Sequence, residues 1–294
     1  MINTDINMNK ENVTKDHRST GKKAMKITIG ILLFLVIVIG LSLVFLGNYR
    51  RNYCSGECPE WMRKAYYAHR GIHASENVDE NSLGAFKLAV EMGYAIEMDL
   101  RYTKDMVPMV SHDNNMLRMC GKDVNLSNID YKDAKELTFI ESGEKILSFE
   151  EFLSYIDGKV PLLIELKAYH IPGKFEENVM KILSSYKGQY AIQSYNPLAL
   201  SYVKKIDPNV TIGLLYDDVP GLPHYRRARI LKDNLFGMIC HPAFITYNAE
   251  LITEHELDLF RNDKNLVFGF TFDEKDISTK SYSDTFDSIV FERR

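Results

Sequence analysis

The sequence predicts an α/β fold: a TIM-type (β/α)8 barrel with a β-hairpin after the second strand and a small insert, preceded by one N-terminal transmembrane helix. From residue 64 onward, short apolar segments alternate with segments long enough for a helix, which is typical of a parallel sheet. Acidic, basic and histidine side chains lie in or just after several apolar segments, as in barrels whose strand ends carry the chemistry. Residues 27–47 contain no charged side chain, which indicates a membrane-spanning helix.

The composition fits one folded domain beside a membrane segment. The chain has 294 residues, of which 45% are hydrophobic and 26% are charged, and both values are ordinary for a globular protein. A single barrel domain of about 250 residues fits within that length. Beyond residue 26 lie 30 of the 36 Lys and Arg residues and 37 of the 40 Asp and Glu residues, which leaves a net charge of −7 there. This acidic balance argues against a nucleic acid as partner, because such binding depends on neutralising phosphates.

The N-terminal region divides into three predicted segments. Residues 1–25 are polar and lack apolar periodicity, so we expect a disordered cytoplasmic tail. Residues 26–48 form the predicted transmembrane helix, whose uncharged part spans about 31 Å at about 1.5 Å per residue. A cleaved signal peptide or a buried helix is the alternative, but no cleavage site of small residues follows the apolar stretch. Residues 49–63 are a predicted juxtamembrane linker, and residues 64–294 are the predicted catalytic barrel domain.

The charges that flank the apolar stretch predict its orientation. Lys22, Lys23 and Lys26 precede it, whereas Arg50 and Arg51 follow it. The excess on the N-terminal side favours a single-pass protein with a cytoplasmic N-terminus and an extracellular barrel domain.

Two cysteines follow the membrane segment closely. Cys54 and Cys58 are separated by three residues, and in an oxidising compartment they can form a small disulfide loop. No nearby pair of Cys or His residues completes a zinc site.

The apolar segments predict nine strands, one of which runs antiparallel. The predicted strands are 65–69, 94–100, 107–111, 161–166, 190–195, 210–216, 236–240, 266–272 and 287–291. The predicted helices are Ser82–Met92, Phe149–Ile156, Lys174–Tyr186, Pro197–Ile206, Tyr225–Leu231 and Ala249–Phe260. Residues 102–107 are too few for a parallel crossover, so we expect a hairpin that turns near Lys104 and Asp105. Eight parallel strands remain, as a barrel requires.

Three carboxylates in apolar strands indicate a metal site. Glu97 and Asp99 are two residues apart and therefore share one face of their strand, and Glu165 occupies a similar place in a later strand. Converging carboxylate oxygens suit a divalent cation such as Ca²⁺ or Mg²⁺. The alternative is that these acids are solvated or form salt bridges, but a charge within an apolar strand is costly to bury without a partner.

Two histidines and two basic residues accompany the carboxylates. Histidine side chains ordinarily titrate near neutral pH. His69 and His112 therefore suit general acid and base catalysis, although either one alone is more often structural. Arg70 and Lys167 supply positive charge for a phosphate. On a continuing strand Arg70 would point away from His69, so we expect Gly71 to end the strand at that point.

The motifs around these residues resemble those of the glycerophosphodiester phosphodiesterase family. The matching segments are His69-Arg70-Gly71, Glu80-Asn81-Ser82, Glu97-x-Asp99, His112-Asp113 and Glu165-Leu-Lys167. Leu117-Arg118…Gly121 and residues 148–153 resemble the family's insert region. The resemblance extends from Tyr67 to the C-terminus and is most specific over residues 67–168. It implies a TIM barrel that uses a divalent metal and two histidines to hydrolyse lipid-derived glycerophosphodiesters to an alcohol and glycerol 3-phosphate.

The resemblance also implies a role for each matching residue. His69 and His112 match the catalytic histidines, and Glu97, Asp99 and Glu165 match the metal ligands. Arg70 and Lys167 match the phosphate-binding positions, whereas Glu80, Asn81 and Asp113 match supporting positions.

The later strands depart from the family pattern, at residues 270–273 and 287–292. These departures leave the substrate open among glycerophosphocholine, glycerophosphoethanolamine, a glycerol-phosphate polymer and a capsular phosphodiester. Gln193, Tyr195, His241 and Asp273 follow late strands, where they either line the barrel mouth or serve in packing.

Two other functions fit the same residues. A phospholipase D-like barrel lyase that acts on intact lipid would release a cyclic phosphate. An anchored binding protein without catalytic activity would not be expected to keep the complete set of two histidines and three acids.

Overall fold

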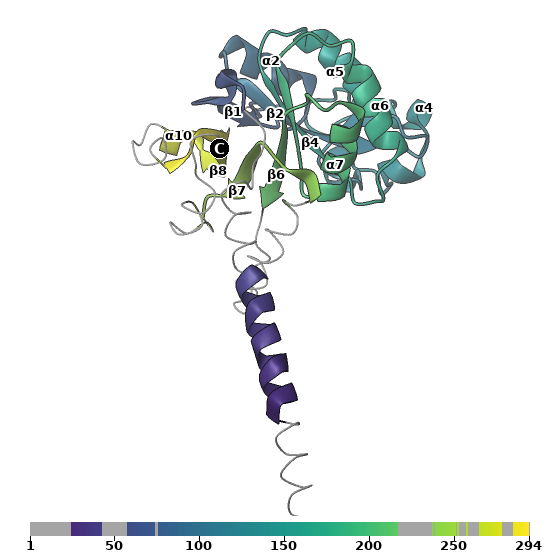
Figure 1. Cartoon of the computed structure of the whole chain (residues 1–294). Helices are drawn as coiled ribbons and strands as arrows, with labels where there is room; N and C mark the ends of the chain where they lie inside the picture. Colours follow the sequence, from purple (N-terminus) through teal and green to yellow (C-terminus); the bar gives the residue numbers. More distant parts are fainter. Residues whose placement is uncertain are drawn as a thin grey trace, which may run out of the picture. The chain divides into compact units, whose positions relative to one another are not determined.

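The computed structural model describes residues 25–42, 58–73, 76–216, 237, 239–250, 252, 257, 265–277 and 285–293. The chain divides into two units, Met1–Asn52 and Tyr53–Arg294. The first unit contains the helix Met25–Ser42, whose mean hydropathy of 2.5 and length would allow it to cross a membrane. Its side chains are exposed, and Figure 1 draws it as the purple helix. The last part of the predicted span, residues 43–48, lies outside the described residues.

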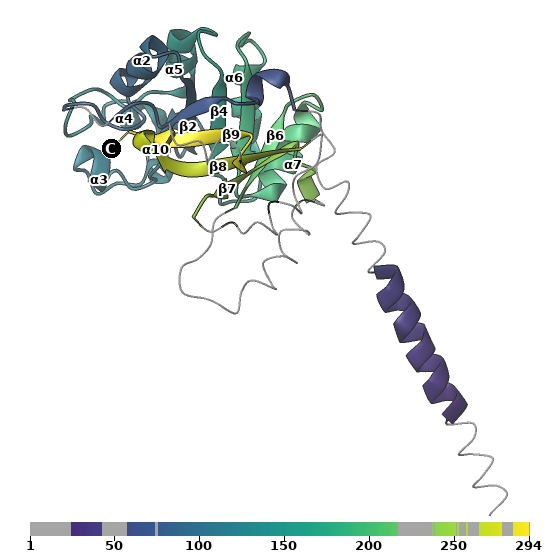
Figure 2. The ribbon, with the colours of Figure 1, turned by 90° about the vertical axis from the view of Figure 1, so that its left-hand side faces the viewer.

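The second unit is a closed barrel. Within the described residues, eight parallel strands form it: β1 (Tyr66–His69), β2 (Ala95–Tyr102), β4 (Leu162–Leu166), β5 (Tyr190–Ser194), β6 (Ile212–Tyr216), β7 (Phe244–Asn248), β8 (Leu266–Asp273) and β9 (Ser288–Glu292). The barrel closes because β1 pairs in parallel with both β2 and β9. Figure 2 shows β8 and β9, in yellow, within the same sheet as the other strands. The predicted fold class is therefore confirmed.

The predicted hairpin is also present. The strand β3 (Pro108–Val110) returns antiparallel along the end of β2, with Leu100 opposite Val110. In the turn, the Thr103 amide donates to Val107 O at 3.1 Å, and the Met106 amide donates to Thr103 O at 2.8 Å. The chain therefore turns at residues 104–105, and the segment after β3 returns to the end of the barrel where β2 carries its acids.

Helices cover the outside of the barrel where the sequence predicts them. They are α2 (Leu83–Glu91), α5 (Phe149–Ile156), α6 (Lys174–Leu183) and α7 (Pro197–Ile206). A short helix that was not predicted, α10 (Glu274–Ile277), follows β8. Ser148 begins α5 with a capping box: its hydroxyl accepts from the Glu151 amide, and the Glu151 side chain accepts from the Ser148 amide. The predicted helix Tyr225–Leu231 and most of the predicted helix Ala249–Phe260 lie outside the described residues.

One predicted strand is wrong. Residues 237, 239 and 240, within the segment predicted as the seventh barrel strand, are helical, and the strand is β7 instead. A short apolar segment without alternation does not distinguish a strand from a buried helix, which explains the error. His241 consequently precedes β7 and does not follow a strand, so it lies away from the barrel mouth.

The hydrophobic core at the N-terminal end of the barrel supports the polar end above it. Its buried members are Met62, Tyr67, Ala95, Leu163, Ala191, Ala243, Phe244, Leu266, Phe268 and Val290. Gly213 makes room for Phe244, because a Cβ there would lie 2.1 Å from the phenylalanine ring. The side-chain period of a strand is two, so the next residue on the same face points to the same interior, nearer the C-terminal end.

The insert between β3 and α5 has a small core of its own. It contains α3 (Leu117–Cys120), the 3₁₀ helix η2 (Leu126–Asn128) and α4 (Tyr131–Ala134). Its buried side chains are Met109, Met116, Met119, Cys120, Leu126, Ala134, Phe139 and Ile146.

Cys58 is partly buried and packs against the barrel core. The Cys58 thiol donates a hydrogen bond to Ala243 O at 3.1 Å, and burial raises its pKa to about 12. Cys54 lies outside the described residues, so its predicted disulfide with Cys58 stays a prediction.

Candidate active site

The polar end of the barrel contains a cavity of about 180 Å³. On β1, β2, β4, β5 and β7, the lining residue comes two positions after a core residue, as the strand period requires. The lining residues are His69, Arg70, Glu97, His112, Glu165, Lys167, Gln193, Tyr195, Leu215, Thr246, Phe270, Thr271 and Val290. A larger groove, of about 780 Å³, includes residues of α5 and α6, but none of its lining residues is a candidate site residue.

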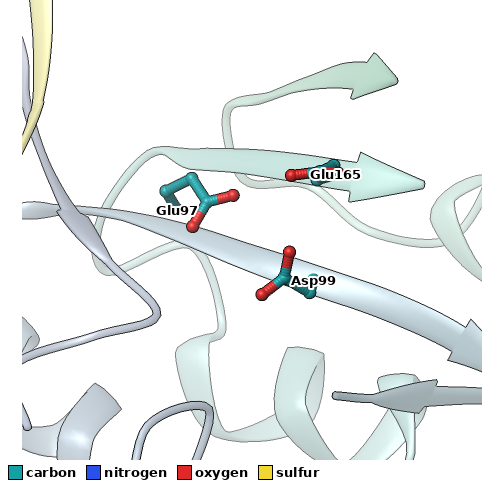
Figure 3. Close-up of side chains that lie close together, drawn as sticks. All are labelled: Glu97, Asp99 and Glu165. Carbon is teal, nitrogen blue, oxygen red and sulfur yellow. The ribbon is translucent and has the colours of Figure 1, made fainter. Parts of the chain in front are cut away.

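The three carboxylates predicted as metal ligands converge. Asp99 on β2 and Glu165 on β4 are register partners, so their side chains share one face of the sheet. One oxygen from each of Glu97, Asp99 and Glu165 lies within 4.8 Å of the others, and all three residues are buried. Figure 3 shows the carboxylates from β2 and β4 directed toward a common space.

The charges around the carboxylates are unevenly balanced. The Lys167 ammonium lies 2.6 Å from Glu165 Oε1 and 3.1 Å from Asp99 Oδ1. Burial raises the pKa of Glu97 well above its usual range, and the Asp99 and Glu165 charges add to that effect. Burial also raises the pKa of Glu165, to about 7, although Lys167 opposes the shift. Burial disfavours the charged form of Asp99 too, but Lys167 and Arg70 together outweigh it and lower its pKa. The positive charge around Glu97 and Glu165 therefore does not compensate for the cost of burying their ionised forms.

Arg70 points toward the site because the backbone turns directly after β1. Arg70 has a φ of 56° and Gly71 a φ of 82°, so the strand ends at His69 as expected. The Arg70 guanidinium then lies 3.3 Å from Asp99 Oδ2 through Nε and donates to Glu80 Oε1 through Nη1 at 3.0 Å. Its amide donates to Glu97 Oε2 at 3.2 Å. The turn thus places Arg70 among the acids and beside His69.

We expect Gly71→Ala to lower the stability of the barrel by about 1–3 kcal/mol and to lower activity with it. A left-handed backbone conformation strains a residue with a Cβ, and the new Cβ would lie 2.8 Å from the Ala85 backbone carbon. Gly93→Ala is the matched control, because Gly93 has a φ of 74° but no heavy atom within 4 Å of its Cβ position. Thermal unfolding of both variants checks this. Equal losses in the two variants would show that contact with Ala85 contributes nothing.

Asn81, one of the predicted supporting residues, is hydrogen-bonded to Asp99 and to the turn after β1. The Asn81 side-chain amide donates to Asp99 Oδ2 at 2.9 Å, and its oxygen accepts from the Asp99 amide at 3.4 Å. The same residue donates its own amide to Arg70 O at 2.9 Å. Asn81 therefore joins the turn after β1 to the acid in the middle of β2.

Each predicted catalytic histidine lies near a carboxylate, but only His112 is within hydrogen-bond distance of its partner. His112 Nδ1 lies 2.8 Å from Asp113 Oδ1, and His69 Nδ1 lies 3.8 Å from Glu292 Oε1 on β9. Burial lowers the pKa of His112, although Asp99 opposes the shift. The hydrogen bond to Asp113 fixes the His112 imidazole tautomer and leaves its Nε2 as the nitrogen for proton transfer.

Several residues at the site were not predicted from the sequence. Thr246 donates to Gln193 Oε1 at 2.9 Å, and Gln193 in turn donates to Glu97 Oε1 at 3.5 Å. Thr246 was missed because its strand was placed too early in the sequence. Arg118 lies between Glu80 and Asp113, and the only sequence signal for it was the resemblance of its segment to the family insert.

Two of the four late-strand candidates line the cavity. Gln193 and Tyr195 are among its lining residues. Asp273 instead accepts a hydrogen bond from the Lys275 amide at 3.1 Å, at the start of α10, which is a structural role.

Comparisons with known proteins agree on one family. A sequence model of the glycerophosphoryl diester phosphodiesterase family matches residues 69–286. A glycerophosphodiester phosphodiesterase from Caldanaerobacter subterraneus is 34% identical over 204 residues, covering 65% of this chain and 80% of the relative. Human lysophospholipase D GDPD1 is 36% identical over 104 residues, covering 34% of this chain and 31% of the relative.

Solved structures show the same fold. A phosphodiesterase from Oleispira antarctica, solved with the product sn-glycerol-3-phosphate, has a TM-score of 0.64 at 20% identity and covers 78% of this chain and 93% of its own. A glycerophosphodiester phosphodiesterase from Thermotoga maritima has a TM-score of 0.62 at 22% identity, with 78% and 94% covered. From the extent of these matches, the chain belongs to the glycerophosphoryl diester phosphodiesterase family of phosphoric diester hydrolases.

Proposed function

We propose that the protein hydrolyses glycerophosphodiesters to an alcohol and glycerol 3-phosphate, with a divalent cation and with His69 and His112 as the acid–base pair. One observation carries the proposal. The cavity brings two histidines, two basic side chains and two of the three acids together, and the third acid, Asp99, lies directly behind them. Family membership supports the reaction class.

The donor set fits a hard divalent cation. The three acids offer only oxygen ligands, which Ca²⁺ and Mg²⁺ prefer. Glu97 and Glu165 are buried with raised pKa values, so a cation of charge two would stabilise their ionised forms. When bound, such a cation neutralises developing charge on a phosphoryl oxygen and polarises the phosphorus.

Arg70 and Lys167 are placed to hold the phosphate. The Arg70 and Lys167 side chains both line the cavity. Each forms an ion pair with the buried Asp99, which holds it in place. Burial disfavours the charged form of Lys167, but Asp99 and Glu165 outweigh it and raise its pKa, so the side chain stays protonated at neutral pH. The guanidinium of Arg70 matches two phosphate oxygens in geometry.

The histidines divide the proton transfers between them. One imidazole takes a proton from the nucleophile, which is water or the neighbouring hydroxyl of the substrate's glycerol. The other gives a proton to the departing alcohol oxygen. If the substrate hydroxyl attacks first, a cyclic phosphate forms, and water then opens it to glycerol 3-phosphate. The hydrogen bond to Asp113 holds the His112 imidazole in the orientation that this exchange needs.

A substrate panel tests the proposal with the full-length chain in detergent. Glycerophosphocholine and glycerophosphoethanolamine should yield glycerol 3-phosphate and the free alcohol in equal amounts. The partial match to a lysophospholipase D supports a second candidate substrate, lysophosphatidylcholine, whose cleavage would release choline. A cyclic phosphate as the final product would favour a lyase. No release of alcohol from any of these diesters, with Ca²⁺ or Mg²⁺ present, would contradict the proposal.

We further propose that the enzyme is anchored in a membrane. In this arrangement residues 1–25 are a cytoplasmic tail, 26–48 span the bilayer, 49–63 are a linker and 64–294 form an extracellular catalytic domain. The apolar helix Met25–Ser42 supports the span, and the lysines that precede it support the orientation.

We expect a protease added to intact cells to digest the barrel domain and leave a protected N-terminal fragment. A tag at residue 1 and an antibody to the barrel, followed on the same blot, report both sides. Protection of the barrel until the cells are lysed would reverse the orientation. Release of the whole barrel domain into the medium would instead indicate a cleaved signal peptide.

A further inference from the structure

We propose that Arg118, contributed by the insert, is a positioning residue that fixes Asp113 behind His112 and Glu80 behind Arg70 at the same time. The inference rests on the proposed function, because it assigns Arg118 a part in the action of those two residues. Arg118 belongs to the four-residue helix α3 and is not among the residues that line the cavity.

The contacts of Arg118 are short and are made by all three guanidinium nitrogens. Its Nε donates to Asp113 Oδ2 at 2.7 Å. Its Nη2 donates to Glu80 Oε1 at 2.6 Å, and its Nη1 donates to Glu80 Oε2 at 3.2 Å. Only the planar, fixed arrangement of donors in a guanidinium can bind both oxygens of one acid and reach a second acid as well.

Each of the two acids, Asp113 and Glu80, also contacts a residue of the proposed active site. Asp113 Oδ1 is 2.8 Å from His112 Nδ1, and Glu80 Oε1 also accepts from Arg70 Nη1 at 3.0 Å. Charges therefore alternate from Arg70 through Glu80 and Arg118 to Asp113, which contacts His112. The network links the proposed phosphate-binding arginine to a proposed acid–base histidine.

The electrostatics agree with this arrangement. Burial opposes ionisation of Glu80, but the hydrogen bonds from Arg118 outweigh it and lower the carboxyl pKa, with help from Arg70. The pKa of Asp113 is lowered in the same way, because the hydrogen bonds from Arg118 and His112 outweigh burial. Arg118 thus keeps Glu80 and Asp113 ionised and oriented toward Arg70 and His112.

The insert is held firmly enough to present Arg118 in one place. Its own hydrophobic core packs beneath α3. Two hydrogen bonds join it to the segment between β1 and α2 and to the first turn of α2: the Ser142 amide donates to Asp79 Oδ2 at 2.9 Å, and the Gly84 amide donates to Glu144 Oε2 at 3.0 Å. The half-exposed Arg118 side chain, 52% accessible, therefore completes an interface between two segments that both contribute to the site.

Kinetics of the full-length chain in detergent provide the first test. Arg118→Ala should lower kcat/KM on the substrate that the wild type cleaves best by about 10- to 100-fold, as expected when a group that orients reacting residues is lost. Arg118→Lys should recover only part of the loss, because an ammonium cannot bind both acids in the same geometry. Millimolar guanidinium ion should restore Arg118→Ala by entering the half-exposed site, and should have no effect on the wild type.

Lys145→Ala is the matched control. Lys145 also lies in the insert and pairs with an acid, Glu136, at 2.8 Å, but this pair is exposed and has no contact with the site. Activity of this variant should stay within about twofold of the wild type, since an exposed ion pair contributes little. A loss in Lys145→Ala as large as that in Arg118→Ala would show that the insert responds to any charge change, and would overturn the inference.

A second readout needs no substrate. In ¹⁵N-histidine-labelled protein, the proton shared by His112 Nδ1 and Asp113 should give a downfield signal that His112→Ala removes. That signal should persist in Lys145→Ala and disappear or move in both Arg118 variants.

An unchanged signal, or unchanged kcat/KM without guanidinium rescue, would overturn the role of Arg118. Inactivity of the wild type on every diester would contradict only the proposed function, because the histidine signal still tests the positioning role. If Arg118→Ala does not fold, Arg118→Lys provides the same test.

Discussion

Replacing either His69 or His112 with alanine is expected to lower kcat/KM on natural diesters by about 10²- to 10⁴-fold, the usual contribution of a general acid or base. Both imidazoles line the cavity, and His112 is held by a hydrogen bond to Asp113. The double variant should be little worse than the poorer single variant, because residues that act as a unit are not additive. In the wild type, kcat/KM should follow a bell-shaped pH profile, with one limb for each group.

A diester with a good leaving group separates the two roles. A nitrophenyl diester needs little protonation of its departing oxygen, so it should restore turnover in the variant that lacks the acid and not in the variant that lacks the base. His241→Asn is the control, since His241 is exposed, precedes β7 and lies away from the cavity. Near-normal rates on natural diesters in both single alanine variants would rule out acid–base catalysis by this pair.

Glu97→Gln and Glu165→Gln are expected to reduce turnover by about 10³-fold or more, since loss of a metal ligand removes several kcal/mol of charge stabilisation. Both variants should remain folded. Burial raises the pKa of each of these acids, so a neutral amide of the same shape relieves repulsion in the metal-free protein. Asp99→Asn should lose turnover and also stability, because it leaves Arg70 and Lys167 without their buried partner.

Activity assays and thermal unfolding with and without added Ca²⁺ or Mg²⁺ check these variants. Glu136→Gln, an exposed acid of the insert, serves as the control and should match the wild type in both measurements. The wild type should gain stability on addition of the cation, because a ligand that binds only the native state stabilises it. The same gain in Glu97→Gln and Glu165→Gln would show that the cation binds elsewhere.

The sequence predicted the barrel well because two local properties decide it: the two-residue side-chain period of a strand and the minimum length of a parallel crossover. Acids two residues apart on β2 had to share a face, and six residues were too few for a parallel return, so the hairpin followed. The strand β7 was misplaced because its neighbouring apolar segment, residues 236–240, is equally apolar and has no alternation. That error hid Thr246, and with it the hydrogen-bond chain through Gln193 to Glu97.

The positions of single side chains around the site were harder to predict. Arg70 was a doubtful candidate on a continuing strand, and only the left-handed backbone at residues 70–71 directs it toward Asp99. Arg118 lies 38 residues from Glu80, and the packing of the insert decides that they meet. Period and spacing within a strand are local properties, whereas contacts between an insert and a distant loop depend on the whole fold.

The most direct test of the account is removal and return of the metal in the wild-type chain. Full-length protein in detergent is treated with a chelator, its metal content is measured, and it is assayed on the diester it cleaves best. We expect activity to fall in proportion to the metal removed, and to return with Ca²⁺ or Mg²⁺ in the wild type but not in Glu165→Gln. Full activity in protein shown to be free of metal would contradict the assignment of Glu97, Asp99 and Glu165 as the metal site.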